Sequence, residues 1–305
     1  MMDNINKELV TVITPTYNKF DDIETTIKSV LMQDYEIIEY IITDDGSRDL
    51  PEDRIRECIA QNKNDNLIRF TIVKNEENVG TVKNLNNAIK SSTGKIIMLL
   101  AGDDIFFDNS VISKIVDRFE TTDSKVIVAS RYCIDEEEKF VGYLPHRNDR
   151  RIIESWNRQQ QHNQFVMSTY RNMASGSIMY FKREIFDEIG LFDERYRLWE
   201  DGPFIYKYTK KYPLYMAYDI VAIKYRMTGN STKGHPLLLH DGKIFTEFEL
   251  VEDKTNKKWL VREAVKCELY LLNHKSIFAI IRYPIISIIY LINVIKENYN
   301  SLIKN

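Results

Sequence analysis

The chain has 305 residues, of which 44% are hydrophobic, and its formal net charge is −3. This length and apolar fraction suffice for one large core with a helical appendage. Lys and Arg are spread among Asp and Glu, so no uniformly basic surface is available and nucleic acid is not expected as a partner. The three cysteines are far apart and lack metal-type spacing, which favours a reducing compartment over a disulfide framework.

The N-terminal residues carry no apolar run of the kind found in signal peptides, which predicts a cytoplasmic protein. From residue 9 to about residue 119, short β-branched runs alternate with amphipathic stretches, as in βαβ units that build a parallel sheet. The predicted strands are Leu9–Ile13, Ile37–Ile42, Ile68–Val73 and Lys95–Leu100. The predicted helices, which carry apolar residues three and four positions apart, are Asp21–Met32, Pro51–Ala60, Thr81–Ser91 and Asn109–Phe119. This first third is typical of a nucleotide-binding architecture.

The element order becomes mixed after residue 120. Further strands are predicted at Lys125–Tyr132, Lys139–Leu144, Ser177–Phe181 and Ile220–Tyr225, with a short helix at Arg183–Ile189. A variable region at about 143–170, rich in Gln, Arg and Asn, is expected to face the acceptor. We therefore divide the chain into a catalytic domain at 1–230, with a nucleotide-binding half at 1–120 and an acceptor-binding half at 121–230, and a helical region at 231–305.

The segment Ile277–Ile295 is strongly apolar and is interrupted by Arg282, Pro284 and Asn293. Its length approaches that of a membrane span, but a charge and a proline inside it weigh against a span. Two alternatives stay open: a helix that lies in the bilayer surface, or a helix packed on the catalytic core.

The first strand ends in small polar residues, a proline and an aromatic residue: Thr14, Pro15, Thr16, Tyr17 and Asn18. Ligands of open parallel sheets gather at the carboxyl ends of strands, so this end is placed to hold a nucleoside. The ring of Tyr17 offers a face for a base, and Pro15 fixes the backbone that presents it. An ordinary strand-to-helix turn is the alternative.

The second strand ends in Asp44-Asp45-Gly46-Ser47. One carboxylate here can accept a hydrogen bond from the imide of a uracil, and the glycine lets the chain reverse. The alternative is that these residues only cap the next helix. We assign the capping role to Asp44 and the nucleoside to Asp45.

Two adjacent carboxylates, Asp103 and Asp104, follow the almost entirely apolar stretch Lys95–Leu100. Burial of such a pair costs several kcal/mol unless a cation or hydrogen bonds compensate. Mn²⁺ or Mg²⁺, held by these oxygens and by a diphosphate, would compensate and would assist departure of the diphosphate as a Lewis acid. An exposed turn with solvated aspartates is the alternative.

A further acidic pair, Glu200-Asp201, follows Leu198-Trp199 and precedes Gly202. Transfer of a glycosyl group with inversion needs one carboxylate to take the proton of the attacking hydroxyl. We assign Asp201 as that base, with Glu200 orienting neighbouring groups or the acceptor. The alternative is that both residues begin a helix and interact with its dipole.

In chain order, Thr-Pro-Thr-Tyr-Asn, Asp-Asp-Gly-Ser, Asn78-Val79-Gly80, Gly-Asp-Asp and Trp-Glu-Asp resemble the signature of glycosyltransferase family 2, the inverting enzymes of the GT-A fold. The resemblance extends roughly from Leu9 to Tyr225. It implies an α/β fold, a GT-A type Rossmann-like mixed and mostly parallel sheet flanked by helices, followed here by a helical C-terminal extension. The implied residues for the nucleotide are Pro15, Thr16, Tyr17, Asp45, Lys83 and Asp103; for the metal, Asp103 and Asp104; for catalysis, Asp201 and Glu200; and for the acceptor, Gly176 and Trp199.

The chain departs from this family pattern at three places. Ala101 stands where many members have the first aspartate of an Asp-x-Asp triplet, so metal binding depends on Asp103 and Asp104. Leu85 replaces an arginine, and Lys83 could supply the lost phosphate contact, although a surface lysine is the simpler interpretation. Met227-Thr228 stands where members often have a histidine that reaches the metal.

The sequence thus predicts a hexosyltransferase that moves a sugar from a nucleotide sugar, a UDP-sugar by preference, to a saccharide or lipid-linked saccharide acceptor in cell-surface glycoconjugate synthesis. An apolar tail beside a cytoplasmic domain suits the inner face of the cell membrane. The alternatives are a catalytically idle nucleotide-sugar-binding protein and a nucleotidyltransferase, which normally needs a glycine-rich phosphate loop that is not found near Thr14–Lys19. The identity of the sugar and self-association into a homo-oligomer stay open.

Overall fold

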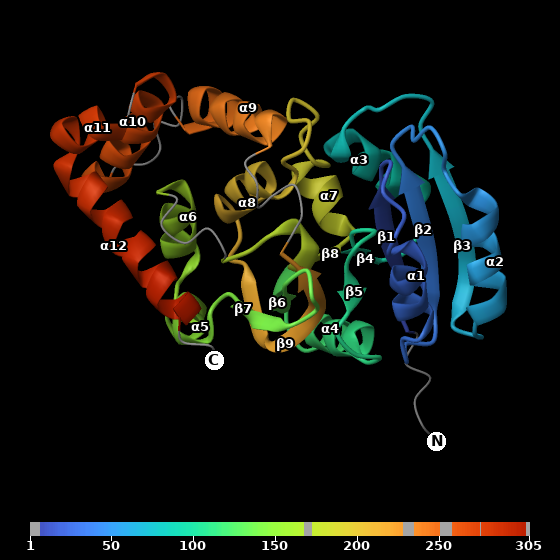
Figure 1. Cartoon of the computed structure of the whole chain (residues 1–305). Helices are drawn as coiled ribbons and strands as arrows, with labels where there is room; N and C mark the ends of the chain where they lie inside the picture. The colour runs from blue at the N-terminus through green and yellow to red at the C-terminus, as the bar shows by residue number, and fades with distance from the viewer. Residues whose placement is uncertain (1–6, 168–172, 228–234, 251–257, 275, 303–305) are drawn as a thin grey trace.

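The computed structural model describes residues 7–167, 173–227, 235–250, 258–274 and 276–302. Over these residues the core is one nine-stranded mixed sheet in the order β3-β2-β1-β4-β8-β6-β9-β5, with β7 paired to β6 and with helices packed around it (Figure 1). The strands are β1 Val10–Thr16, β2 Ile38–Asp44, β3 Leu67–Lys74, β4 Ile96–Leu99, β5 Ile105–Phe106, β6 Val126–Ile134, β7 Phe140–Leu144, β8 Met179–Lys182 and β9 Tyr215–Arg226. The predicted mixed α/β fold is confirmed.

The first half of the sheet is parallel, as its βαβ pattern predicts. Strand β1 pairs with β2 and β4, and β2 pairs with β3, all in parallel. The connecting helices are α1 Ile23–Leu31, α2 Glu52–Asn62, α3 Thr81–Ser91 and α4 Val111–Glu120. Their apolar stripes are buried, as on α4, where Val111, Ile115 and Phe119 share the face that packs on the sheet. The carboxyl ends of β1, β2 and β4 therefore meet at one edge.

Antiparallel pairing enters in the second half. Strand β8 lies between β4 and β6 and is antiparallel to both, whereas β6 and β9 are parallel. Helix α7 Glu184–Ile189 follows β8, and α8 Asp201–Thr209 precedes β9. The predicted strand at Ser177–Phe181 is instead a 3₁₀ turn at Gly176–Ile178 followed by β8. The insertion of β8 brings the segment before α8 beside the end of β4.

Two helices occupy a region for which the sequence predicted no elements. They are α5 Arg147–Glu154 and α6 Arg158–Val166, and α6 starts with a capping box between Asn157 and Gln160. Few apolar residues mark them, so their helical period is weak in the sequence. Part of the expected acceptor region, residues 168–170, lies outside the described residues.

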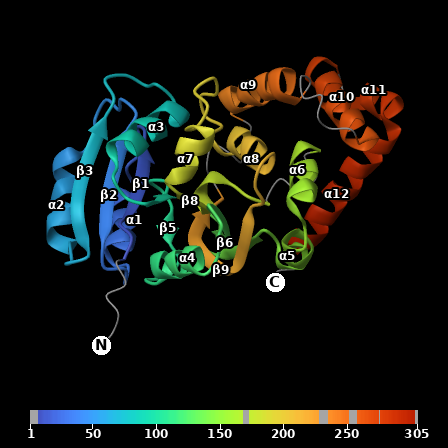
Figure 2. The ribbon, with the colours of Figure 1, turned by 180° about the vertical axis from the view of Figure 1, so that it is seen from behind.

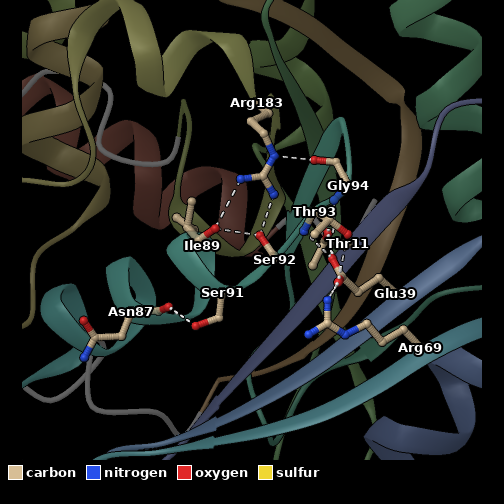
Figure 3. A network of polar contacts seen from close by, with 10 residues as sticks. All are labelled: Thr11, Glu39, Arg69, Asn87, Ile89, Ser91, Ser92, Thr93, Gly94 and Arg183. Carbon is tan, nitrogen blue, oxygen red and sulfur yellow. Dashed lines mark hydrogen bonds and ion pairs between the residues drawn. The ribbon is translucent and has the colours of Figure 1, made fainter.

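A buried carboxylate, Glu39, joins the amino ends of β1 and β2, and Figure 3 shows the polar contacts around it. Glu39 on β2 accepts hydrogen bonds from Thr11 Oγ1 at 2.6 Å and from the Thr93 backbone N–H at 2.7 Å, and it pairs with Arg69. Burial raises its pKa, but the hydrogen bonds from Thr11, Thr93 and Gly94 outweigh that effect and leave the pKa below its usual value. Glu39 therefore stays ionised and fixes the start of the sheet.

The C-terminal region is helical, as predicted. Helix α9 spans Pro236–Phe245 and continues as a π-helical turn at Thr246–Leu250, and α10 spans Trp259–Asn273. The apolar segment after it is divided into α11 Ser276–Arg282 and α12 Pro284–Leu302, because proline has no N–H and is best accommodated where a helix begins. Helices α10, α11 and α12 lie at the opposite end of the molecule from β3 and α2 (Figures 1 and 2).

The two last helices have an inner and an outer face. Ala279 and Ile286 are buried, and the guanidinium of Arg282 lies over the ring of Tyr270. The outer face is almost entirely apolar and exposed, up to 77% at Ile281, and comprises Ile277, Phe278, Ile280, Ile281, Ile285, Ile288, Leu291, Ile292, Val294 and Ile295. Among the described residues, no helix combines the length and the apolar character that crossing a bilayer requires.

Candidate functional site

The loops that follow β1 and β2 are tied to each other. The backbone N–H of Asn18 donates to Ser47 Oγ at 2.8 Å, and Asp44 accepts hydrogen bonds from both the Ser47 backbone and its hydroxyl. The hydroxyl of Thr16, which is buried, lies 3.2 Å from Asp44 Oδ1. Asp44 thus shapes the turn after β2 and does not cap α2 as predicted, because the N-cap of that helix is Pro51 and no side chain caps it. Thr16 supports the turn rather than presenting its side chain outward.

Asp45 is buried at the end of β2 and faces the segment before α3. Its two oxygens accept the backbone N–H groups of Val79 at 2.8 Å and Gly80 at 2.9 Å, and Asn75 lies 3.3 Å from Oδ1. Gly80 adopts a positive φ of 92°, which suits glycine and aims both amides at the carboxylate. A carboxylate has about four lone-pair sites, so Asp45 retains capacity for one more donor.

The other residues predicted to contact the nucleotide surround this loop cluster. Tyr17 is 49% exposed, so its ring is free for stacking, and Pro15 precedes it at the end of β1. On α3, Lys83 is exposed and points away from the core, whereas Leu85 is buried in it. The helix therefore presents a lysine, not residue 85, to solvent.

The acidic pair after β4 is divided between surface and interior. Asp103 is partly exposed and forms an ion pair with Lys19, Nζ to Oδ2 2.6 Å. Asp104 is buried, and burial, with the negative charge of Asp103 adding to it, raises its pKa to about 8. The backbone N–H of Arg226 on β9 donates to this carboxyl and opposes the rise.

These two carboxylates are suited to a metal that arrives with a diphosphate. No cluster of three or more His, Cys, Asp or Glu that could hold a metal occurs within the described part of the chain. Mg²⁺ and Mn²⁺ are commonly bound by one or two carboxylates, substrate phosphates and water, so a full protein cage is not required. Of the residues at the third departure, Thr228 lies outside the described residues.

Asp201 is the first residue of α8 and points back toward the 3₁₀ turn. Its Oδ2 accepts the Gly176 backbone N–H at 2.8 Å, and the Gly202 backbone and the Trp199 side chain also donate to it. Burial raises the pKa of Asp201, against the effect of these hydrogen bonds. Burial and the charge of Asp201 raise the pKa of neighbouring Glu200 to about 8.

Two glycines allow this pair to pack. A Cβ on Gly176 would lie 2.2 Å from Glu200 Oε1, and a Cβ on Gly202 would lie 2.1 Å from the ring of Trp199. Gly176 and Trp199, predicted at the acceptor site, thus contact the acidic pair directly. Whether they also contact an acceptor stays a prediction.

Sequence reasoning missed Asp241, which holds the segment that leads to the acidic pair. This buried carboxylate on α9 accepts the backbone N–H groups of Arg197 at 3.0 Å, Leu198 at 2.7 Å and Trp199 at 3.1 Å. Phe245, on the same helix, packs against the Trp199 ring with centroids 5.1 Å apart. Helix α9 therefore positions the residues immediately before Asp201.

Sequence reasoning also missed Arg131, a buried residue in the middle of β6. Its positive charge lowers the pKa of both Asp104 and Asp201, in opposition to burial. Since charge effects weaken with distance, one guanidinium is near enough to influence both carboxyls although 97 positions separate them in the chain (201 − 104). A charged residue inside an apolar strand run was the available signal.

Comparison with known proteins identifies the family of this chain. The sequence model of the family "Glycosyl transferase family 2" matches residues 11–190, more than half of the chain. An uncharacterized glycosyltransferase of Rickettsia prowazekii is 26% identical over 232 residues, which cover 76% of this chain and 68% of that protein. Of four other relatives from the same genus, the chain spans between a quarter and two thirds of the length.

Solved structures share the fold at low sequence identity. TarS of S. aureus, residues 1–349 in complex with UDP-GlcNAc, has a TM-score of 0.59 at 14% identity, with 88% of this chain and 74% of that chain covered. The mannosyltransferase PcManGT of Pyrobaculum calidifontis, in complex with GDP-Man and Mn²⁺, has a TM-score of 0.59 at 18% identity, with 93% and 74% covered.

Proposed function

This chain belongs to glycosyl transferase family 2, and from that premise we propose that it transfers a sugar from a UDP-sugar to an acceptor hydroxyl, with inversion at the anomeric carbon. The observation that carries the proposal is that two carboxyls from separate elements, the buried Asp104 after β4 and Asp201 at the start of α8, are both influenced by the charge of Arg131. An inverting transfer needs a base on one side of the anomeric carbon and stabilisation of the departing diphosphate on the other. In this proposal Asp201 provides the base, and Asp104 lies on the side of the departing diphosphate.

In the proposed reaction, Asp201 takes the proton from the acceptor hydroxyl as its oxygen forms a bond to the anomeric carbon. The bond from that carbon to the diphosphate oxygen breaks, and its electron pair leaves with the diphosphate. Burial raises the pKa of Asp201, which makes it a stronger base than a solvated aspartate. Gly176 N–H and the Trp199 side chain hold the carboxylate in place, and Glu200 lies beside it to orient the acceptor.

On the donor side, Tyr17 would stack on the base and Asp45 would accept the imide N–H of uracil. Asp103 and Asp104 would hold Mn²⁺ or Mg²⁺ together with phosphate oxygens, and such a metal supplies Lewis-acid stabilisation of the departing charge when bound. Lys19 would then exchange its contact with Asp103 for the phosphates.

The test is transfer or hydrolysis of a panel of UDP- and GDP-sugars with Mn²⁺, measured as release of nucleoside diphosphate. We expect Asp201→Asn to lower turnover by about 10² to 10⁴, the range that a general base contributes, while UDP binding is retained. Asp219→Asn is the matched control, since Asp219 pairs with Arg118 on the surface. Unchanged turnover in Asp201→Asn would exclude the base, and absence of nucleotide binding in the wild type would exclude the donor.

We also propose that the outer face of α11 and α12 lies on a bilayer, where the acceptor would be a lipid-linked or membrane-held saccharide. Exposed apolar patches of this extent are unusual on a protein surface that faces only water. No Asp or Glu occurs between Ser276 and Ile295, and Arg282 is the one charged residue of that stretch. An apolar face that lacks carboxylates suits the boundary between headgroups and acyl chains of a bilayer.

Sedimentation with vesicles that contain phosphatidylglycerol tests this surface. Wild-type protein is expected to sediment with the vesicles, and the double variant Ile281→Glu, Ile288→Glu to stay in the supernatant. Ile68→Glu is the control, because Ile68 is 60% exposed on β3 at the other end of the molecule. Failure of the wild type to bind vesicles, with a dimer that the double variant dissociates, would show that a second copy covers this face instead.

A further inference from the structure

Arg131 is a buried cation whose hydrogen-bonding capacity is not used up inside the protein. It is 6% exposed, and its Nε is buried without a hydrogen-bond partner among the described residues. The guanidinium carbon lies 4.6 Å from the centroid of the Tyr225 ring on the neighbouring strand β9. Stacking of this kind fixes the plane of the guanidinium and leaves its edge, where the N–H groups lie, available.

A buried donor without a partner costs on the order of 1–3 kcal/mol. Neighbouring cations differ in that carboxylates compensate their charge, although the Nε of Arg226 also lacks a hydrogen-bond partner within the described part of the chain. Lys19 pairs with Asp103, and Arg226 approaches Glu138 and Asp22 at 3.3 and 3.7 Å. Arg131 forms no such ion pair with Asp104 or Asp201, although its charge affects both. We therefore expect a ligand from outside the chain to accept a hydrogen bond from Arg131 and to compensate its charge.

The position between the two carboxyls restricts what that ligand is. If Asp201 activates the acceptor hydroxyl and Asp104 lies on the diphosphate side, the bond that breaks lies between them, beside Arg131. The group at that point which best matches a planar fork of N–H donors is a phosphate, which arginine commonly binds through two parallel hydrogen bonds. A sugar hydroxyl would not compensate the buried positive charge.

We propose that Arg131 binds the sugar-linked phosphate of the nucleoside diphosphate donor and stabilises the charge that develops there as the glycosidic bond breaks. This inference rests on the proposed function, which supplies the diphosphate. It makes Arg131 a contact of the leaving group from β6, on the acceptor-binding half of the chain. The phosphate would thus be contacted from both halves of the chain, by the metal that Asp103 and Asp104 would hold after β4 and by Arg131 on β6.

The test compares binding of UDP and UMP by calorimetry in MnCl₂, since only UDP carries the phosphate in question. We expect Arg131→Met to weaken UDP binding tenfold or more and UMP binding less than twofold. Arg131→Lys, which keeps the charge but not the fork, is expected to lie between the wild type and Arg131→Met. Arg118→Met, which removes a surface arginine paired with Asp219, is the control and should match the wild type.

The inference is overturned if Arg131→Lys and Arg131→Met bind UDP as the wild type does, or if UDP and UMP weaken by the same factor. A variant that fails to fold would not bind UMP either, so retained UMP binding verifies the fold within the same experiment. Wild-type protein that binds UMP and UDP equally would also overturn it. If the wild type binds neither nucleotide, the proposed donor is wrong and the inference falls with it.

Discussion

Replacement of Gly80 by alanine tests how the nucleotide side of the site is joined to the base side. The Gly80 N–H donates to Asp45, and a Cβ at this position would lie 2.7 Å from the carbonyl oxygen of Arg197 and 2.5 Å from its Cγ. Arg197 begins the segment that Asp241 holds and that leads to Asp201. A single added methyl group therefore acts on both acidic elements of the site.

The magnitude follows from two effects. The backbone of Gly80, with φ 92° and ψ 155°, lies in a region that is essentially restricted to glycine, and a residue with a Cβ there costs on the order of 1–3 kcal/mol. Overpacking against a backbone oxygen, which cannot rotate away, costs roughly 1–3 kcal/mol more. The sum, about 2–6 kcal/mol, corresponds to a fall in Tm of about 4–24 °C at roughly 2–4 °C per kcal/mol.

Thermal unfolding followed by circular dichroism measures this change, and nucleotide release measures its effect on turnover. Gly142→Ala is the matched control, because a Cβ on Gly142 of β7 meets nothing within 4 Å. We expect the control to unfold within about 1–2 °C of the wild type. If Gly80→Ala unfolds at the same temperature as the control, the close approach between Gly80 and Arg197 does not constrain the site and the reasoning is refuted.

The remaining predictions concern three carboxylates. Asp241→Asn removes the charge that three backbone N–H groups face. We expect kcat to fall by about tenfold to a hundredfold, as misplacement of a catalytic group by about 1 Å can cause, while UDP affinity is unchanged. Restored turnover in Asp241→Ala would contradict this prediction. Glu39→Gln should destabilise the protein at pH 7 by about 1–3 kcal/mol in urea unfolding. The folded pKa of Glu39 lies below its ordinary value of 4.5, so the stability that its charge contributes is present above that value and is lost as the pH falls through the folded pKa. The free energies of unfolding of the wild type and the variant should therefore converge in acid. A difference that stays constant with pH would show that the charge is not responsible. For Asp201, whose pKa burial raises, kcat/KM should fall as the pH drops through a half-point above the ordinary aspartate value of 3.8, and a rate that stays flat down to that value would exclude it as the base.

The sequence by itself determined the elements of the nucleotide-binding half. Short β-branched apolar runs mark β1 to β4, and apolar residues three and four positions apart mark α1 to α4, because each of these patterns reflects one local backbone geometry. It also indicated the loops after β1, β2 and β4, since carboxyl ends of parallel strands meet at one edge whatever else the fold contains. The sequence did not predict the two-residue strand β5 or helices α5 and α6, because a short strand and a polar helix have too little apolar periodicity to detect.

Only the tertiary structure decided which side chains meet. The apolar run around Arg131 marks it as an unusual charged residue, but the run does not show which groups it meets; that depends on the insertion of β8 between β4 and β6. Asp241 resembles any helical aspartate in the sequence, yet it accepts three backbone amides more than 40 positions away. Such contacts depend on strand order and on helix packing across the sheet, which local periodicity does not encode, because it records only which face of each element is buried.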